Sequence, residues 1–243
     1  MTHTKLLFLE DMQMLTSEAI VLEVTEEDGK TVLILDQTCF YPQGGGQPYD
    51  QGIIQNEQAK FSVEEVRFVE GIVKHIGTFT LEGKFKFGDT VTCYVASERR
   101  HLHTRLHSAG HVIDMAVTSL GLSWTPGKGY HFPAGPYIQY TGTLEETGRE
   151  ELRKNIEEKC NAIIREGQET SIRFMPKEKM HTVCHHVPEY LPEGKPTRVV
   201  MYGNFGVPCG GTHVKNLRDI KSISIRKIKM DHGNIQISYD VER

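Results

Sequence analysis

The chain changes from strand to helical patterning within residues 90–120, TVTCYVASERRHLHTRLHSAGHVIDMAVTSL. Up to Val95 apolar and polar residues alternate with the period of two that is typical of a β-strand. From Ser97 the apolar residues fall within one helical stripe that ends before Gly121. The stripe consists of Leu102, Leu106, Ala109, Ile113, Ala116, Val117 and Leu120. The change predicts two domains, residues 1–95 and residues 96–243.

Residues 17–95 predict a small all-β domain. The segment SEAIVLEVTEEDGKTVLILDQT, residues 17–38, contains two alternating runs around Asp28-Gly29, a pair typical of a hairpin turn. Many short strands in one segment favour a barrel-like arrangement. The further strands are expected near 61–69, 71–80 and 90–96. Between the strands lies FYPQGGGQP, residues 40–48, which is too rich in glycine and proline for regular structure.

The C-terminal part predicts an α+β domain with an antiparallel sheet. A second helix is expected at about 145–166, with Thr143 and Glu146 as a capping box. A third, short helix is expected to start at Pro176. Strands are expected at 171–175, 197–203, 221–229 and 234–241. Helices and antiparallel strands in this order indicate the α+β class.

Composition narrows the protein class. The chain has 243 residues, of which 38% are hydrophobic and 25% are charged, and these are ordinary globular values. Glu10 and Asp11 interrupt the only apolar stretch near the start. We therefore expect a protein without an export signal or a membrane span. Five cysteines without regular spacing do not resemble a disulfide framework, so we expect a reducing cytoplasmic location.

Two pairs of residues could bind a metal. His103, His107 and His111 recur at every fourth residue and share one face of the first predicted helix. Two imidazoles one turn apart can supply half of a tetrahedral zinc site, although solvated histidines would show the same spacing. The second pair is Cys209 and His213, separated by Gly-Gly-Thr. A rival group, His181-Thr-Val-Cys184-His185-His186, lacks a second pair elsewhere.

Charge is divided along the chain. Residues 1–96 carry 7 basic and 15 acidic side chains, so the formal net charge of −4 leaves +4 for residues 97–243. Lys215–Lys229 has a net charge of +5, and Arg99, Arg100 and Arg105 lie beside the helix histidines. Such runs suit RNA phosphates, although lysines also protect exposed strand edges. The expected tRNA contacts are Arg99, Arg100, Lys221 and Lys227.

Three motifs together resemble a known family. They are FYPQGGGQPYDQG (40–52), HSAGHV (107–112) and CGGTHV (209–214). They are similar to the signature segments of the alanyl-tRNA synthetase editing domain and its freestanding AlaX-type relatives. The resemblance extends from about residue 5 to 240. It implies a β-barrel-like domain followed by an editing domain that is shared with threonyl-tRNA synthetase.

The resemblance also implies roles for individual residues. One zinc ion per chain would be held by His107, His111, Cys209 and His213. Thr38 would face the aminoacyl pocket and Gln47 would be functional, so both are candidate catalytic residues. Substrate contacts are implied for Thr38, Gly44, Gly45, Gly46 and Gln47. Two segments depart from the family pattern: Ser108 replaces the usual threonine, and NLRDIK, residues 216–221, replaces the usual run after the CGGTHV segment.

The resemblance therefore implies an enzyme that hydrolyses serine or glycine mischarged onto tRNA(Ala). A synthetase pocket that accepts alanine cannot strongly exclude glycine or serine, so a second hydrolytic step is useful. Zinc would position the substrate or activate water. Two alternatives stay open at this stage: editing of threonyl-tRNA, and a non-catalytic, zinc-stabilised RNA-binding module.

Overall fold

The computed structural model describes residues 3–242 as two compact units. The barrel unit comprises the residues up to Gly44 together with Pro48–His101. The α+β unit comprises Gly45–Gln47 together with the residues from Leu102 on. The division of the chain into domains at residues 1–95 and 96–243 stays a prediction. None of the helices in residues 3–242 has the length and apolar character needed to cross a membrane.

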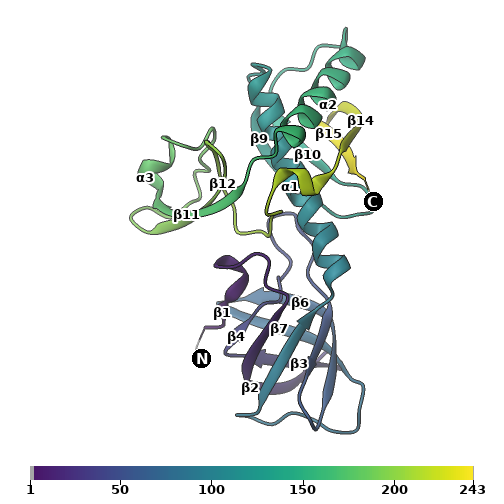
Figure 1. The fold of residues 1–243 in the computed structure, drawn as a ribbon, viewed down its shortest axis with the longest axis vertical. Coiled ribbons are helices and arrows are strands. Elements are labelled where there is room, and N and C mark those ends of the chain that lie inside the picture. The colour runs from purple at the N-terminus through teal and green to yellow at the C-terminus, as the bar shows by residue number, and fades with distance from the viewer. Residues whose placement is uncertain (1–2, 243) are drawn as a thin grey trace. The chain divides into compact units, whose positions relative to one another are not determined.

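Six antiparallel strands close the barrel in the order β2-β3-β7-β6-β5-β8 (Figure 1). They are β2 (Thr16–Glu27), β3 (Lys30–Leu35), β5 (Gly52–Gln55), β6 (Lys60–Val69), β7 (Ile72–Phe79) and β8 (Thr90–Val95). Inward-facing residues such as Val21, Leu33 and Phe61 are fully buried and fill the interior. The expected barrel and the α+β class are confirmed.

The ends of the strands show how the chain builds the barrel. Asp28 and Gly29 have φ angles of 50° and 75°, so the expected hairpin turn between β2 and β3 is confirmed. Outside the barrel, β1 (Lys5–Leu6) pairs in parallel with β4 (Gln37–Thr38), and the short 3-10 helix η1 (Leu7–Leu9) follows β1.

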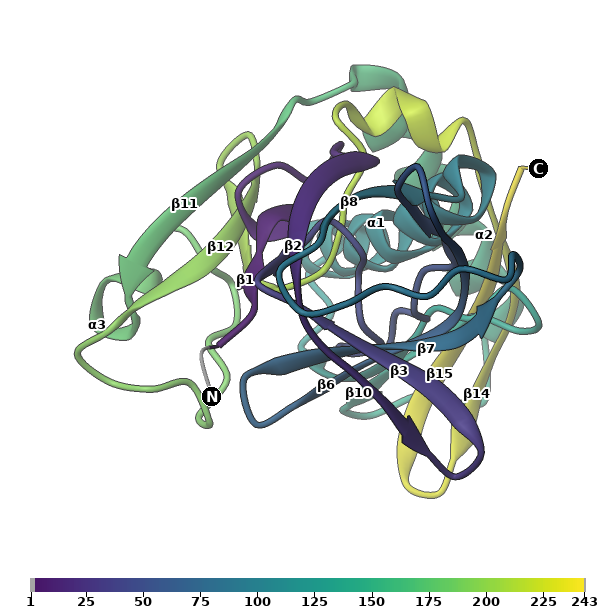
Figure 2. The same ribbon diagram turned by 90° about the horizontal axis from the view of Figure 1, so that it is seen from below.

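A four-stranded antiparallel sheet and two long helices form the centre of the α+β unit. The strand order is β14-β15-β10-β9. The elements are α1 (Ser97–Ser119), β9 (Thr125–Tyr130), β10 (Tyr137–Thr141), α2 (Arg149–Glu166), β14 (Ile223–Asp231) and β15 (Asn234–Val241). Apolar residues of both helices and of one sheet face form a single core. Figure 2 shows β14 and β15 as one long hairpin.

A smaller sheet leads to the second pair of expected ligands. Its order is β11-β12-β13, and Figure 1 shows α3 beside β11 and β12. The elements are β11 (Thr170–Pro176), α3 (Lys177–Met180), β12 (Pro196–Tyr202), β13 (Phe205–Pro208) and the 3-10 helix η2 (Leu217–Ile220). β13 ends directly before Cys209, and Asn216 caps η2 in a capping box with Asp219.

Two expectations need correction. The helix α2 begins at Arg149, not at about 145, and no side chain caps it. The reason is Gly148, which adopts a left-handed conformation with φ 79° directly before the helix, so a Thr143–Glu146 capping box does not form. The strands β9, β10 and β13 were not expected, because all three are short and because β9 and β13 contain glycine and proline.

Candidate metal centre

Four side chains from two distant segments converge in the α+β unit. His107 and His111 come from α1, and Cys209 and His213 come from the segment after β13. One ligand atom from each lies within 4.8 Å of the others. The His107 Nε2 atom lies 3.4 Å from the Cys209 Sγ atom. The structure therefore brings together the four residues that the sequence pairs, in a cluster that can hold a metal ion.

The other histidines are placed differently. His103 is only 1% exposed but lies outside the cluster, although it shares a helix with His107. His181 and His185 are exposed, while Cys184 packs into a small apolar core. Among residues 3–242, the cluster of His107, His111, Cys209 and His213 is the only group of three or more His, Cys, Asp or Glu side chains with metal-binding geometry.

A buried amide orients His107. The Gln47 side chain is fully buried, and its Oε1 atom accepts hydrogen bonds from His107 Nδ1 at 2.8 Å and from the Thr212 amide at 3.0 Å. Gln47 Nε2 donates to Thr212 Oγ1 at 2.9 Å. Because the carbonyl oxygen can only accept, His107 carries its proton on Nδ1. The Nε2 lone pair is then available to a metal ion.

The other two imidazoles are also held through Nδ1. His111 Nδ1 lies 3.3 Å from the Asp114 carboxylate, which also accepts from Tyr140 Oη at 2.6 Å. His213 Nδ1 lies 2.8 Å from Tyr202 Oη. Metal-binding histidines commonly bond through the second ring nitrogen in this way.

The donor atoms fit zinc. His111 Nε2 is buried and has no hydrogen-bond partner within the described part of the chain. Three imidazole nitrogens and one thiolate form a set that zinc commonly binds in tetrahedral geometry. Four protein ligands are typical of a closed site, whereas catalytic zinc commonly keeps one position open. The donor set therefore supports zinc without deciding between a structural and a catalytic role.

Burial and neighbouring charges lower the pKa of three ligands of the cluster and raise that of His111. Burial lowers the pKa of His107 and His213 well below the usual range, and nearby charged groups lower them further. Burial also lowers the pKa of His111, but the neighbouring Asp114 carboxylate and Cys209 sulfur raise it to about 10. Burial raises the pKa of Cys209, and the neighbouring His111 outweighs that effect and lowers it. Neutral imidazoles and a thiolate are the forms that bind metal, so His111 would release a proton when a metal ion binds.

Small residues let the two ligand segments approach each other. A Cβ atom at Gly211 would overlap the His107 ring, so glycine is needed there for a steric reason. Ser108 Oγ accepts a hydrogen bond from the Val214 amide at 3.0 Å and ties α1 to the second segment. Ser108 thus supplies a hydroxyl where the family pattern has threonine.

Sequence reasoning missed His131. Its ring stacks on His107 with the centroids 4.6 Å apart and the planes at 21°. His131 Nδ1 lies 2.7 Å from Tyr239 Oη, and a Cβ atom at Gly110 would collide with the ring. Burial lowers the pKa of His131 to about 3, and the charge on His111 adds to this. A single histidine in a glycine- and proline-rich segment gives no sequence signal for such a place.

Thr38 lies in the barrel unit and is fully buried. Its Oγ1 atom lies 2.9 Å from His75 Nε2 and accepts from the Phe40 amide at 3.0 Å. His75 Nδ1 faces the Leu33 carbonyl oxygen at 3.2 Å, so Nε2 is the acceptor and the Thr38 hydroxyl donates to it. The Thr38 oxygen could accept one more hydrogen bond, but the side chain has no exposed surface in this structure, and its substrate role stays a prediction.

The expected glycine contacts lie on the loop that leads to Gln47. Gly45 and Gly46 have φ angles of 53° and 80°, a region that favours glycine. A Cβ atom at Gly46 would overlap the Gly129 carbonyl group. Gly44 is exposed and has more space around it. The proposed contacts of these glycines with substrate stay predictions.

The two arginines of the expected tRNA surface differ in burial. Arg100 is 1% exposed and forms an ion pair with the fully buried Asp50. Its guanidinium also donates to the Cys39 carbonyl oxygen at 2.7 Å. Because its donors serve the interior of the barrel unit, we leave Arg100 out of the proposed RNA surface. Arg99 is half-buried, with its guanidinium 5.3 Å from the centre of the Tyr49 ring.

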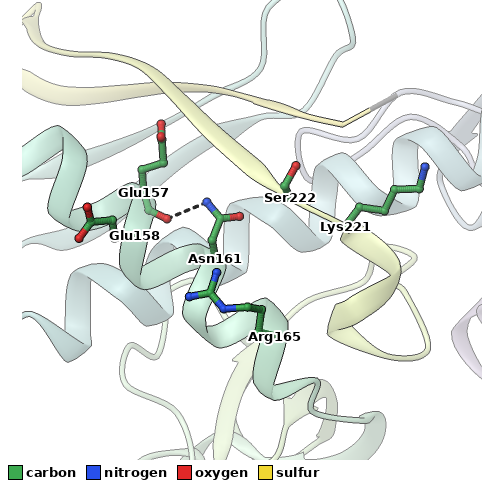
Figure 3. A pocket seen from close by; sticks show the side chains of 6 residues that line it. All are labelled: Glu157, Glu158, Asn161, Arg165, Lys221 and Ser222. Carbon is green, nitrogen blue, oxygen red and sulfur yellow. Dashed lines mark hydrogen bonds between the residues drawn. The ribbon is translucent and has the colours of Figure 1, made fainter.

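The two lysines of the expected tRNA surface are exposed. Lys221 forms an ion pair with Glu242 at 3.5 Å. It also lines a pocket of about 630 Å³ between α2 and the segment after η2 (Figure 3). The pocket residues are Glu157, Glu158, Asn161, Arg165, Lys221 and Ser222, so both signs of charge are present and no cluster residue takes part.

Comparisons with known proteins agree with these features. Residues 4–99 match the family described as tRNA synthetases class II (A). Residues 197–236, which include Cys209 and His213, match the threonyl and alanyl tRNA synthetase second additional domain.

Similar proteins cover nearly the whole chain. The alanyl-tRNA editing protein AlaX-M of Methanosarcina barkeri is 29% identical over 93% of this chain and 93% of its own length. AlaX-L of Pyrococcus horikoshii is 29% identical over 90% of this chain and 53% of its own length. The alanine–tRNA ligase of Methanothrix thermoacetophila is 34% identical over 84% of this chain.

This chain is similar to the AlaX-type alanyl-tRNA editing proteins. It spans between 22% and 26% of the length of the alanine–tRNA ligases that it matches. Its length agrees better with that of AlaX-M, and Cys209 and His213 of the cluster lie within the matched second additional domain.

Proposed function

We propose that this chain is a zinc-dependent hydrolase that acts in trans on mischarged tRNA(Ala), removing serine and, as a second substrate, glycine. The observation that carries the proposal is the convergence of His107, His111, Cys209 and His213 in a chain similar to editing proteins. The expected compartment is the cytoplasm, in agreement with five free cysteines.

The residues around the cluster would hold the site rigid. Gln47 fixes the His107 ring, and Thr212 fixes Gln47 through two hydrogen bonds. Asp114 and Tyr202 do the same for His111 and His213. Gln47 thus acts as a positioning residue. Zinc bound by these residues would supply Lewis-acid chemistry, either polarising the ester or lowering the pKa of a water molecule.

Serine selection is assigned to Thr38. Its hydroxyl proton is directed to His75, so the serine hydroxyl would donate to the remaining lone pair of the Thr38 oxygen. This contact would favour serine over alanine, which lacks the hydroxyl. It would not act on glycine, which lacks the hydroxyl too.

The decisive experiment compares hydrolysis of four purified substrates. Ser-tRNA(Ala) and Gly-tRNA(Ala) should be deacylated, while Ala-tRNA(Ala) and Ser-tRNA(Thr) should persist. Turnover of Ser-tRNA(Thr) alone would indicate threonyl-type editing. Zinc binding without turnover of any substrate would indicate a non-catalytic RNA-binding module.

Variants connect the activity to the cluster. Cys209→Ala should lose most of the zinc and the deacylation. His185→Ala is the matched control, because His185 is an exposed histidine outside the cluster. Equal zinc loss in both variants would contradict the assignment of the ligands.

A further inference from the structure

The four-stranded sheet of the α+β unit has two chemically different faces. Ile138, Tyr140, Ile235 and Ile237 are buried in the core that the sheet shares with α1 and α2. Because side chains alternate along a strand, their neighbours point to the opposite face. Those neighbours are half-buried or exposed, and they include tyrosine, serine, glutamine and lysine.

The strand register builds one row across this opposite face. Lys227 on β14 pairs with Ser238 on β15, and Ser238 pairs with Tyr137 on β10. Tyr137 in turn pairs with Tyr130 on β9. One row therefore contains a cation, a small polar side chain and two aromatic rings.

The aromatic end of the row is a stack of near-parallel rings. The Tyr130 and Tyr137 centroids are 5.1 Å apart with the planes at 17°, and Phe132 continues the stack at 4.4 Å and 14°. The spacing of the tyrosines is close to the separation of about 4.8 Å between neighbouring strands, so the stack runs across the sheet. The other face of Tyr137 therefore points toward the small Ser238 side chain.

Cations lie on β9 and β14, the two outer strands of the same sheet. Lys128 and Lys227 are exposed, and within the described chain neither lies within 4 Å of an acidic oxygen. The Arg226 guanidinium reaches the Pro136 carbonyl oxygen at 3.1 Å, next to Tyr137, and forms an ion pair with Asp240 at 3.0 Å. A flat ring with cations beside it suits a nucleobase and its phosphate.

We propose that this face binds single-stranded RNA, with one unpaired base stacked on Tyr137 above Ser238 and the adjoining phosphate at Lys227. The identity of the RNA as the unpaired end of tRNA rests on the proposed function. The RNA-binding chemistry itself rests on the row and the ring stack.

The end of β9 and the two residues after it connect this face to the metal centre. Tyr130 and Phe132 belong to the stack, and the residue between them, His131, packs on the opposite side against His107. RNA bound at the stack would thus contact a segment that also contacts a proposed zinc ligand.

The test measures binding of a short single-stranded RNA of mixed sequence, without an attached amino acid, to the full chain by fluorescence anisotropy. One lost base–aromatic stack should weaken binding roughly 5- to 150-fold in Tyr137→Leu. Tyr137→Phe keeps a ring and should bind as the original chain does. Phe174→Leu is the matched control, since Phe174 is an aromatic residue 57% exposed on the other sheet. It should leave binding unchanged.

Two further measurements show whether a change in affinity comes from base stacking. Ser238→Leu fills the space above Tyr137 without removing a ring, and should also weaken binding. A strand of the same length without bases should bind the original chain and Tyr137→Leu equally. Unchanged RNA affinity in folded Tyr137→Leu and Ser238→Leu would overturn the proposal. It would also be overturned if these variants changed only the association of the chain with a second copy of itself.

Deacylation separates this inference from the proposed function. If Tyr137→Leu loses RNA affinity while the original chain hydrolyses no mischarged tRNA, the RNA face stands and the proposed function fails. If deacylation is active and RNA affinity is unchanged in both variants, the function stands and the RNA face is overturned.

Discussion

Gln47 connects two distant segments through a single buried amide. Its contacts with His107 and Thr212 predict that Gln47→Leu weakens zinc binding about 10- to 100-fold, a usual effect of removing a partner of a metal ligand. Competition with a chelator measures this affinity. Gln43→Leu is the control, because Gln43 is exposed on the same loop. Normal zinc affinity with lost turnover would instead place Gln47 at the substrate.

Substitutions of Thr38 test how the site would select serine as the amino acid to remove. One lost hydrogen bond costs about 0.5–1.5 kcal/mol, so Thr38→Val should slow serine deacylation from a few-fold to tenfold and leave glycine deacylation nearly unchanged. Thr38→Ser keeps the hydroxyl and should retain serine activity. Because Thr38 also supports His75, the melting temperature of each variant must be recorded. Equal loss of both activities would assign Thr38 to packing.

At the scale of elements, His75 on β7 predicts a pH dependence of barrel stability. Burial lowers its pKa to about 4 from an ordinary value of 6.5. Between pH 6.5 and 4 the unfolded chain therefore binds more protons than the folded chain, and stability falls as the pH falls. The loss is on the order of 3 kcal/mol.

Urea unfolding at several pH values measures this effect. His75→Gln cannot titrate, so its unfolding free energy should fall less steeply over the same interval. Parallel pH profiles for the two proteins would show that His75 is not the source.

The elements show what the sequence could predict. The sequence predicts α1 from its apolar stripe and from Gly121, which marks its end. It predicts the β2–β3 hairpin from two alternating runs around the turn at Asp28-Gly29. By contrast β9, TPGKGY, has strand structure only because it pairs with β10. The same limit applies to His131 and Asp114, whose roles depend on contacts that no local pattern encodes.

At the scale of the whole molecule, RNA binding should depend on salt. Phosphate contacts release counterions, so tRNA affinity should fall steeply as salt increases. The double variant Lys221→Glu with Lys227→Glu should weaken binding of charged and uncharged tRNA alike and leave the zinc content unchanged. Affinity that does not respond to salt would contradict an electrostatic surface.

The whole site also shows which ligands the sequence could identify. The spacing of His107 with His111 and of Cys209 with His213 was sufficient to propose the pairs, but their approach within 4.8 Å depends on the folded unit. Arg100 shows the opposite outcome: its place in a basic run suggested RNA, while the fold pairs it with Asp50 in the interior.

The central claim is that bound zinc is required for deacylation, and one titration tests it most directly. Metal is removed from the full chain with a chelator, zinc is returned in steps, and the rate of Ser-tRNA(Ala) hydrolysis is measured at each zinc content. We predict a rate that rises in proportion to bound zinc and stops rising at one ion per chain. Full activity in the metal-free chain, or no activity after one zinc ion per chain is restored, would contradict the account.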